Sequence, residues 1–250
     1  MPVKLYYEEF GMGIPILCIH GFPLDHTIWN RLIPILATNK QVILPDLRGH
    51  GLSPIPPAPY SMNEMAGDIL TLMDDLHLPK VVLVGQSMGG YVALEVAEIA
   101  PERLLGLVLV ASHPYADSPQ QKQARMDMIE QVRQDGVEKA LVDFPAKLCP
   151  DAGIQDFTWN IIQGMEEEGV VGSIQAMADR HDNREVMLNA AFPTAVILGE
   201  NDLFISQDVR QRMQSDFPTT QFTILPDAAH MLMMEKPLEV SRILQNINAT

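Results

Sequence analysis

The stretch Val81-Val82-Leu83-Val84-Gly85-Gln86-Ser87-Met88-Gly89-Gly90 decides the fold of this chain. Its first four residues predict a short buried strand, and the residues from Gly85 to Gly89 match the pattern G-x-S-x-G. This pattern is typical of a strand that turns sharply into a helix and holds the central serine in a strained conformation, with its hydroxyl pointing outward. The two flanking glycines leave room for the crowded backbone, and Gly90 lets the helix lie close to the sheet. The stretch therefore predicts a nucleophile elbow at Ser87.

Short apolar strands alternate with amphipathic helices on both sides of this elbow. The expected strands are Ile14–His20, Gln41–Asp46, Lys80–Gly85, Leu105–Ala111, Thr194–Gly199 and Thr220–Pro226, with Val3–Glu9 as an antiparallel edge strand. The expected helices cover residues 62–76 (after a Ser61 cap with Glu64 three residues on), 87–100, and the segment from Pro237 onward. Alternation of this kind predicts an α/β fold with a mostly parallel central sheet covered on both faces.

The segment from His113 to Ala191 breaks this alternation, because it shows helical patterns and no convincing strand. We expect a helical cap over residues 113–191, inserted into a core formed by residues 1–112 and 192–250. Five methionines of this segment stand out: Met126, Met128, Met165, Met177 and Met187. A methionine side chain adapts to irregular apolar partners, so each of them is expected either to line a substrate pocket or to pack the small core of the cap itself.

Composition and charge exclude several classes of partner. The 250 residues include 17 basic and 32 acidic side chains, a net charge of −15. Phosphate backbones and anionic membranes are bound by clustered Lys and Arg, so neither nucleic acid nor a membrane surface is expected as a partner. The two cysteines, Cys18 and Cys149, form no C-x-x-C pattern, and the first residues lack the apolar core of a signal peptide. The expectation is a soluble, cytoplasmic protein; its oligomeric state is left open.

A serine hydroxyl becomes nucleophilic only when a base lies within hydrogen-bond reach and an acid orients that base. With a G-x-S-x-G elbow, the expected order along the chain is Ser, then Asp or Glu, then His. Asp202 and His230 each follow an expected strand, and loops at the carboxyl ends of parallel strands converge on one edge of the sheet. We therefore predict a catalytic triad of Ser87, Asp202 and His230, with Glu200 and Asp227 as alternative orienting carboxylates.

Two backbone N–H groups are expected to stabilise the negative oxygen of a tetrahedral intermediate. One is that of Met88, which begins the helix after the elbow, and the other is that of Phe22, in the loop His20-Gly21-Phe22-Pro23. Gly21 allows this turn, whereas Pro23 has no N–H to donate. His20 itself is expected to brace the loop rather than to act in catalysis.

The motifs together resemble the α/β-hydrolase family, in its capped serine carboxylesterase form. They run from one end of the chain to the other and are His20-Gly21-Phe22-Pro23-Leu24-Asp25, Asp46-Leu47-Arg48-Gly49-His50-Gly51-Leu52-Ser53, Gly85-Gln86-Ser87-Met88-Gly89-Gly90, Gly199-Glu200-Asn201-Asp202, and Ala229-His230 running into Glu235-Lys236-Pro237. The resemblance implies that the segment from Asp46 to Ser53 is a structural turn beside the site. No cofactor is implied, and the remaining histidines are too scattered to predict a metal site.

The resemblance implies hydrolysis of small-molecule carboxylic esters with small to medium acyl chains, through an acyl-enzyme. Enol-lactones, thioesters and carbon–carbon bonds are alternative substrates for the same triad. Related carbon–carbon hydrolases often carry a tryptophan shortly after the catalytic histidine, and here Met231-Leu232-Met233-Met234 follows, which favours esters. Formation of peracids is an expected side activity. From a different class, a ligand sensor with slow turnover and a non-catalytic scaffold are the other hypotheses.

Overall fold

A computed structural model describes residues 2–247 of the chain. Its strands are β1 (Tyr7–Phe10), β2 (Ile14–Ile19), β3 (Lys40–Pro45), β4 (Val81–Gln86), β5 (Leu104–Val110), β6 (Thr194–Gly199) and β7 (Gln221–Leu225). Its helices are α1 (Ile33–Leu36), α2 (Met62–Asp75), α3 (Met88–Ile99), α4 (Pro119–Asp135), α5 (Val137–Ala140), α6 (Phe144–Leu148), α7 (Ala152–Gln163), α8 (Glu167–Asp179), α9 (Arg184–Leu188), α10 (Gln207–Asp216), α11 (Leu232–Glu235) and α12 (Pro237–Asn246), with the 3-10 helices η1 (His26–Leu32) and η2 (Pro101–Arg103).

The strands form one seven-stranded sheet in the order β1-β3-β2-β4-β5-β6-β7. Only β1 is antiparallel to its neighbour, and the six other strands are parallel. The predicted mostly parallel sheet is therefore confirmed, with each strand end within two residues of its expected position except at β1. The chain starts at the edge strand β1, and β2 then lies inside the sheet with β3 on one side and β4 on the other, so the strand order reverses between β2 and β4. Ligands bind preferentially at such a switch point in open α/β sheets.

The edge strand is the element that the sequence placed least well. The expected strand Val3–Glu9 pairs only from Tyr7, because the backbone before it bonds elsewhere: the N–H of Val3 donates to the Asp68 carboxylate at 2.7 Å, and that of Tyr6 to the Ser53 hydroxyl at 2.8 Å. Strand β1 then continues to Phe10, which pairs with Val42.

Local capping chemistry defines where the main helices begin. The Ser61 hydroxyl accepts from the Glu64 N–H, while the Glu64 carboxylate accepts from the Ser61 N–H, so the predicted capping box at the start of α2 is confirmed. A second box, between Ser118 and Gln121, begins α4, with Pro119 at its first position. These caps satisfy backbone donors that have no partner within a helix.

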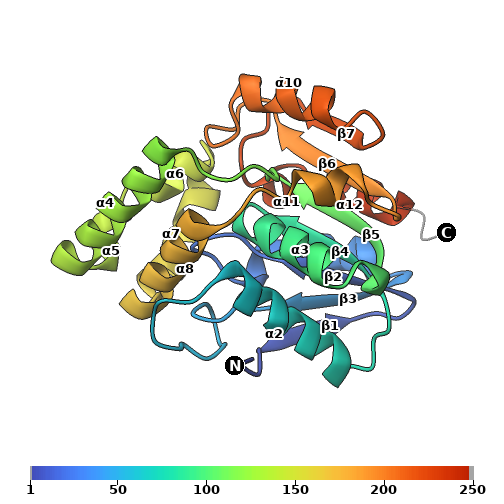
Figure 1. Ribbon diagram of the computed structural model, residues 1–250, viewed down its shortest axis with the longest axis horizontal. Helices are drawn as coiled ribbons and strands as arrows, with labels where there is room; N and C mark the ends of the chain where they lie inside the picture. The colour runs from blue at the N-terminus through green and yellow to red at the C-terminus, as the bar shows by residue number, and fades with distance from the viewer. Residues whose placement is uncertain (1, 248–250) are drawn as a thin grey trace.

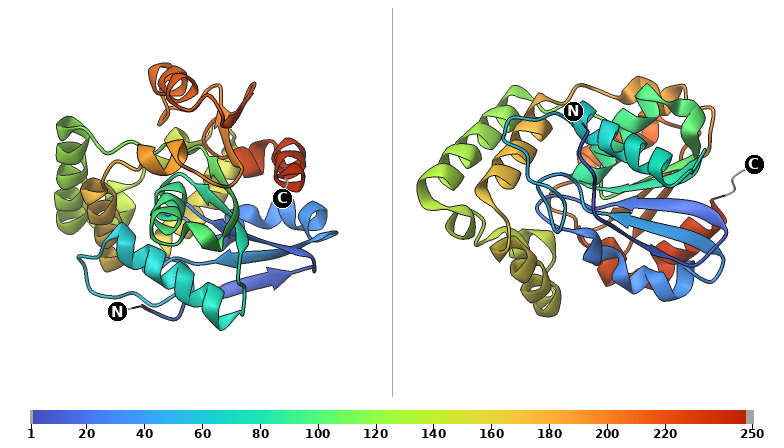
Figure 2. Two further views of the ribbon diagram at one scale, coloured as in Figure 1. Left: turned by 45° about the vertical axis from the view of Figure 1, so that its right-hand side comes forward. Right: turned by 90° about the horizontal axis from the view of Figure 1, so that it is seen from below.

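Two apolar layers cover the sheet. Helices α2 and α3 lie on one face and α1 and α12 on the other, as the view from below shows (Figure 2). The first layer is built from residues such as Ile69, Leu72 and Val92, and the second from residues such as Trp29 and Leu244. Burial of both faces explains why the central strands are almost wholly apolar.

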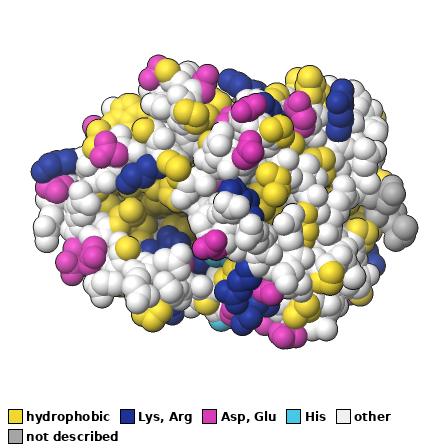
Figure 3. Space-filling model, turned by 90° about the horizontal axis from the view of Figure 1, so that it is seen from above, with side chains coloured by type: hydrophobic (Ala, Val, Ile, Leu, Met, Phe, Trp, Pro, Cys, Tyr) yellow, Lys and Arg dark blue, Asp and Glu magenta, His cyan; other side chains and the backbone are white. Residues whose placement is uncertain are grey.

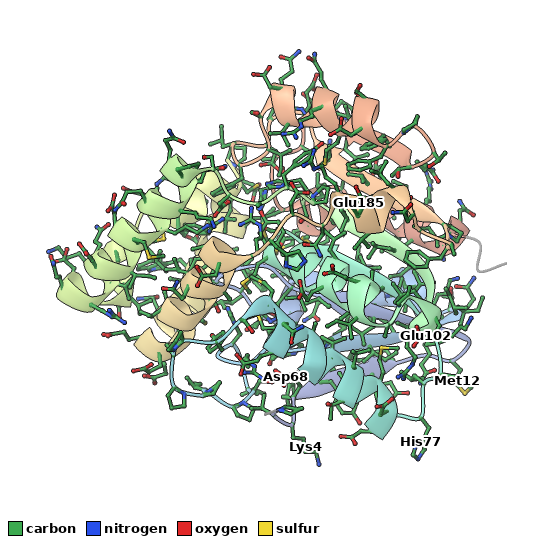
Figure 4. The ribbon with its side chains drawn as sticks, viewed as in Figure 1. Lys4, Met12, Asp68, His77, Glu102 and Glu185 are labelled. Atoms are coloured by element: carbon green, nitrogen blue, oxygen red, sulfur yellow. The ribbon has the colours of Figure 1, made fainter. Side chains whose placement is uncertain are left out.

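Helices α4 to α8 stand together beyond the ends of the central strands, at the left of Figure 1. Helix α9 does not join this group, because it packs beside α3, where Glu185 is labelled (Figure 4). No strand occurs in residues 113–191, all of which the structure describes. Among residues 2–247, no helix combines the length and the apolar character needed to cross a membrane.

Candidate active site

Ser87 lies at the sharp turn between β4 and α3. Its backbone has φ +50° and ψ −115°, so the predicted strained conformation is confirmed. The strain is held from two sides: the Ser87 N–H donates to the Val110 carbonyl at 3.0 Å, and the Ser112 hydroxyl donates to the Ser87 carbonyl at 2.7 Å. A Cβ atom on Gly85 would lie 2.3 Å from the Gly89 carbonyl oxygen, so the turn closes only around glycine.

His230 and Asp202 lie side by side in the loops that follow β7 and β6. The Nδ1 of His230 is 2.8 Å from Oδ2 of Asp202, and both side chains are buried. The other oxygen of Asp202 accepts the backbone N–H groups of Phe204, at 2.8 Å, and Ile205, at 3.2 Å. Burial alone would raise the pKa of Asp202, but the attraction of His230 and these hydrogen bonds hold that pKa below its usual value. Asp202 is therefore ionised at neutral pH.

This pairing selects the tautomer of His230. A carboxylate can only accept, so Nδ1 of a neutral His230 carries the proton that it shares with Asp202, and Nε2 presents a lone pair. The two alternative carboxylates lie elsewhere. Glu200 and Asp227 are exposed, and Glu200 accepts from the Asp227 N–H at 3.4 Å. Asp202 is thus the carboxylate that the fold brings to His230.

The loop that carries His230 is clamped by Glu235, a residue of the predicted motif to which the sequence gave no role. Its two carboxylate oxygens accept the N–H groups of Ala229, at 2.8 Å, and Met231, at 2.9 Å, on either side of His230. The His230 N–H donates to the carbonyl of Leu148, at the end of α6, at 3.0 Å. The histidine backbone is therefore held both by its own loop and by the helices that follow β5.

The loop after β2 lies directly beside the elbow. A Cβ atom on Gly21 would be 2.0 Å from Oε1 of Gln86, so the two loops approach as closely as glycine allows. The Met88 N–H has no acceptor within its own helix, because Met88 is the first residue of α3. For the Phe22 N–H, the described part of the chain supplies no acceptor either. The two predicted oxyanion donors thus lie in the loop after β2 and at the start of α3.

His20 braces this loop, as expected. The ring is fully buried; its Nε2 accepts the Leu47 N–H at 3.0 Å, and its Nδ1 donates to the Gly21 carbonyl at 2.9 Å. The structure therefore places both ring nitrogens of His20 in contacts that tie the loop after β2 to the loop after β3. Burial lowers the pKa of His20, which favours the neutral ring that these bonds require.

The segment Asp46–Ser53 is a structural turn beside the site. Asp46 is buried and accepts from the N–H groups of His26 and Leu52, each at 2.8 Å. Arg48 forms a forked pair with Asp68 of α2, at 2.6 and 2.8 Å, and Asp68 is labelled on that helix in Figure 4. The bonded side chains connect this turn to the core, and none of these three charged side chains faces the elbow cavity.

One cavity of about 180 Å³ opens onto Ser87 and His230. Its lining combines apolar and polar side chains: Phe22, Met128, Phe144, Met177, Phe204 and Ile205 form the apolar part, and Tyr91, His113, Asp117, Gln121 and Arg125 form the polar part. A hollow lined by hydrophobic side chains and bordered by Lys or Arg is visible in the left part of the molecule in Figure 3. The polar group comes largely from the segment between β5 and β6, and the sequence did not predict it.

Of the five methionines singled out in that segment, two line the cavity. Met128 and Met177 do so, whereas Met165 lines a separate groove between α7 and the turn at Asp46. Met126 and Met187 pack in the apolar layer instead. Some of these methionines therefore line the cavity, and others pack in the apolar core. Which of the two a methionine does depends on which face of its helix it occupies.

A small acidic group at the surface includes one of the scattered histidines. The Nε2 of His181 is 2.6 Å from Glu98, and its Nδ1 is 3.7 Å from Glu95. Exposed acidic groups of this kind are common without a bound ion, so we assign no metal to it. His77 lies two residues beyond the end of α2, at the lower edge of the view in Figure 4.

Comparison with known proteins places this site in a family. The model of the alpha/beta hydrolase fold matches residues 14–149. A thermophilic esterase from Thermogutta terrifontis, solved with malate bound, is 34% identical, with a TM-score of 0.92 over 97% of this chain and 92% of that one. The pimeloyl-[acyl-carrier protein] methyl ester esterase of Legionella pneumophila strain Corby is 26% identical over 92% of each chain. An enol-lactonase from Burkholderia xenovorans LB400 shares the fold, with 20% identity and a TM-score of 0.89 over 97% and 95% of the two chains.

The chain therefore belongs to the α/β-hydrolase family. It is an enzyme of the esterase type, with hydrolytic activity, and the predicted fold class is confirmed.

Proposed function

We propose that this protein hydrolyses carboxylic esters of small to medium acyl chains through an acyl-enzyme. The observation that carries the proposal is the shared cavity: Ser87, on a strained turn, and His230, held by an ionised Asp202 at 2.8 Å, line the same space of about 180 Å³. An activated serine needs this arrangement of base and orienting acid. The acyl group is bound under helices α4 to α8, which we propose as the cap of residues 113–191.

In the proposed mechanism, Nε2 of His230 takes the proton from the Ser87 hydroxyl as its oxygen attacks the ester carbonyl. Asp202 stabilises the imidazolium that forms and keeps Nδ1 protonated. The imidazolium then gives its proton to the departing alkoxide, which leaves the acyl group on Ser87. Water, deprotonated by the same Nε2, attacks the acyl-enzyme and releases the acid.

The backbone N–H groups of Phe22 and Met88 are proposed to receive the negative oxygen of both tetrahedral intermediates. They come from the two strands that flank the switch point, β2 and β4, whose loops approach as closely as Gly21 allows. A donor that is already in place needs no reorganisation when charge develops, and one such donor typically contributes about a hundred- to a thousand-fold in rate.

The size of the cavity supports small substrates. Ligand pockets for drug-sized molecules have volumes of roughly 300–1,000 Å³, whereas this cavity has about 180 Å³. The rings of Phe22, Phe144 and Phe204 crowd it, with centroids 5.7 Å apart for the first pair and 5.6 Å for the second. Long acyl chains would have to displace them.

The test is steady-state hydrolysis of p-nitrophenyl esters from acetate to decanoate, with Ser87→Ala and Ser215→Ala as a matched pair. Ser215 is exposed on α10, so Ser215→Ala removes a serine hydroxyl at a position away from the cavity. We expect turnover to peak at short chains, to fall by about four orders of magnitude or more in Ser87→Ala, and to persist in Ser215→Ala. A fluorophosphonate should add one adduct per chain, on a peptide that contains Ser87.

Full turnover by a folded Ser87→Ala variant would overturn the proposal. Absence of turnover on every ester, with the fluorophosphonate adduct still forming, would direct the test to enol-lactones, thioesters and carbon–carbon substrates of the same triad. A stoichiometric burst without further turnover would instead favour the ligand sensor.

A further inference from the structure

Two guanidinium groups and one carboxylate meet at the polar end of the cavity. Asp117 is buried; its Oδ1 accepts from Nη2 of Arg180 at 2.7 Å, and its Oδ2 accepts from Nε of Arg125. Burial would raise the pKa of Asp117, but the two arginines hold that pKa below its usual value, so the carboxylate is ionised. The group therefore carries one excess positive charge, in a chain whose net charge is −15.

Arg125 is the member of this group that reaches the cavity with donors to spare. Its Nε is used by Asp117, and its Nη1 contacts the Met177 sulfur, a weak acceptor, at 3.3 Å. Its Nη2 has no partner among the residues that the structure describes, and the side chain is 24% exposed. Arg180, by contrast, is 4% exposed and packs over the Tyr91 ring at 4.0 Å. Arg125 thus presents N–H groups to a ligand, while Arg180 anchors Asp117 from behind.

The neighbours of Arg125 are also donors. Gln121 lies one turn earlier on α4 and lines the same cavity; its Oε1 is occupied by the Ser118 N–H at 2.8 Å, so only its NH₂ group remains to be used. His113 accepts the Tyr115 N–H at its Nδ1, at 3.3 Å, so its proton lies on Nε2, which is 3.5 Å from the Tyr91 hydroxyl. Burial, and then the charge of Arg180, lower the pKa of His113 to about 3, so the ring is neutral.

This end of the cavity is rich in donors, and its single carboxylate is already saturated. The complement of such a surface is a group that only accepts hydrogen bonds and carries negative charge. Met128 follows on the same face of α4, and the cavity that holds Arg125 and Ser87 is also lined by apolar side chains. A substrate that fits both parts has a short apolar segment between its ester and a free carboxylate.

We propose that Arg125, with Gln121 beside it, is a specificity residue that binds a free carboxylate on the acyl part of the substrate, so that the preferred substrates are monoesters of short dicarboxylic acids. This inference rests on the proposed function for the position of the reacting ester, but the binding of the anion does not depend on the chemistry. The Arg125 fork matches a carboxylate geometrically, which a lysine ammonium does not.

The kinetic test uses monomethyl succinate, glutarate and adipate, each against the neutral ester in which a methyl ketone replaces the carboxylate. Hydrolysis is followed by proton release at constant pH. The readout is the ratio of kcat/KM for the anionic ester to that for its ketone partner. Because hydrogen bonds to charged groups are worth more than neutral ones, we expect Arg125→Gln to lower this ratio about ten- to a hundred-fold for the best-fitting length. Arg133→Gln, which removes the same charge from an exposed position on α4, should leave the ratio unchanged.

A binding test separates this inference from the proposed function. Calorimetry with monomethyl glutarate is done in the Ser87→Ala background. The affinity should fall about tenfold or more when Arg125→Gln is added. If Ser87→Ala hydrolyses both esters at the wild-type rate, the proposed function fails and the binding result still stands. Equal affinity with and without Arg125→Gln, or an unchanged kinetic ratio, overturns the inference.

Arg125→Lys keeps the result interpretable if the glutamine variant does not fold, which its melting curve would show. Lysine preserves the charge that faces Asp117 but loses the fork, so the ratio should fall several-fold relative to wild type. An unchanged ratio in a folded Arg125→Lys variant would equally contradict a forked contact with the substrate.

Discussion

The substitution Asp202→Asn probes the proposed triad with almost no change of shape. One oxygen of Asp202 accepts two backbone N–H groups, from Phe204 and Ile205, and the other accepts Nδ1–H of His230. In the variant, the amide oxygen should stay with the two backbone donors, which leaves the NH₂ group facing Nδ1. His230 would then have to accept at Nδ1 and carry its proton on Nε2, the tautomer that cannot take a proton from Ser87.

The magnitude follows from the loss of the base. In serine proteases the same change lowers kcat about 10⁴-fold, which corresponds to about 5 kcal/mol of barrier. Folding should suffer far less, because both backbone donors keep an acceptor: we expect a loss of about 1–3 kcal/mol, the value of one hydrogen bond to a charged group. The assay is kcat for a short-chain p-nitrophenyl ester, together with urea unfolding of both proteins.

The matched controls are Glu200→Gln and Asp227→Asn, which neutralise exposed carboxylates in the same two loops. Each should retain kcat within about threefold, because exposed charges act weakly through solvent. The reasoning would be refuted by an Asp202→Asn variant that is folded and keeps more than a tenth of the wild-type kcat. It would also be refuted if Glu200→Gln or Asp227→Asn caused the larger loss.

Two further perturbations test the frame around the site. Gly89→Ala would place a Cβ atom 2.4 Å from the Ile19 carbonyl oxygen. We therefore expect the free energy of unfolding, measured in urea, to fall by about 1–3 kcal/mol or more, and turnover to be lost. A stable, active variant would show that the elbow tolerates displacement. Burial lowers the pKa of His50 to about 3. Between pH 6.5 and 3 the unfolded chain therefore binds a proton at His50 more readily than the folded chain does. The stability contributed by the neutral ring is fully present above pH 6.5 and is lost as pH falls toward 3. At pH 5 this loss is about 2 kcal/mol relative to pH 8. The free energies of unfolding of wild type and His50→Gln, measured in urea, should therefore differ in their change from pH 8 to pH 5 by that amount. The same change in both proteins would contradict this prediction.

The fold and the elbow could be predicted from the sequence because both depend on short-range patterns. A run such as Val81–Val84 has the same meaning wherever it occurs, and G-x-S-x-G names the residue types that a strained turn requires. The same holds for the capping box at Ser61. Edge strand β1 was placed less well, because its start depends on which distant side chains take up the N–H groups of Val3 and Tyr6.

The candidate site was partly readable for a different reason. Parallel strands deliver their carboxyl ends to one edge, so residues after β4, β6 and β7 were expected to meet, and the sequence named Asp202 and His230 as the partners of Ser87 on that ground. It kept Glu200 and Asp227 as alternatives to Asp202 for the acid that faces the histidine. That choice depends on the direction of each side chain in its loop, and the structure places Asp202, rather than Glu200 or Asp227, at 2.8 Å from His230.

The polar end of the cavity was not readable at all. Asp117, Arg125 and Arg180 lie up to 63 positions apart in the chain, on a loop, on α4 and just after the end of α8, and no fixed spacing relates them. Their contact arises from the way in which α4 and α8 pack against each other, which depends on many apolar contacts at once. Local periodicity therefore determined the scaffold and the elbow, whereas long-range packing of the helices between β5 and β6 determined the charge and shape of the pocket, because only packing brings such distant side chains together.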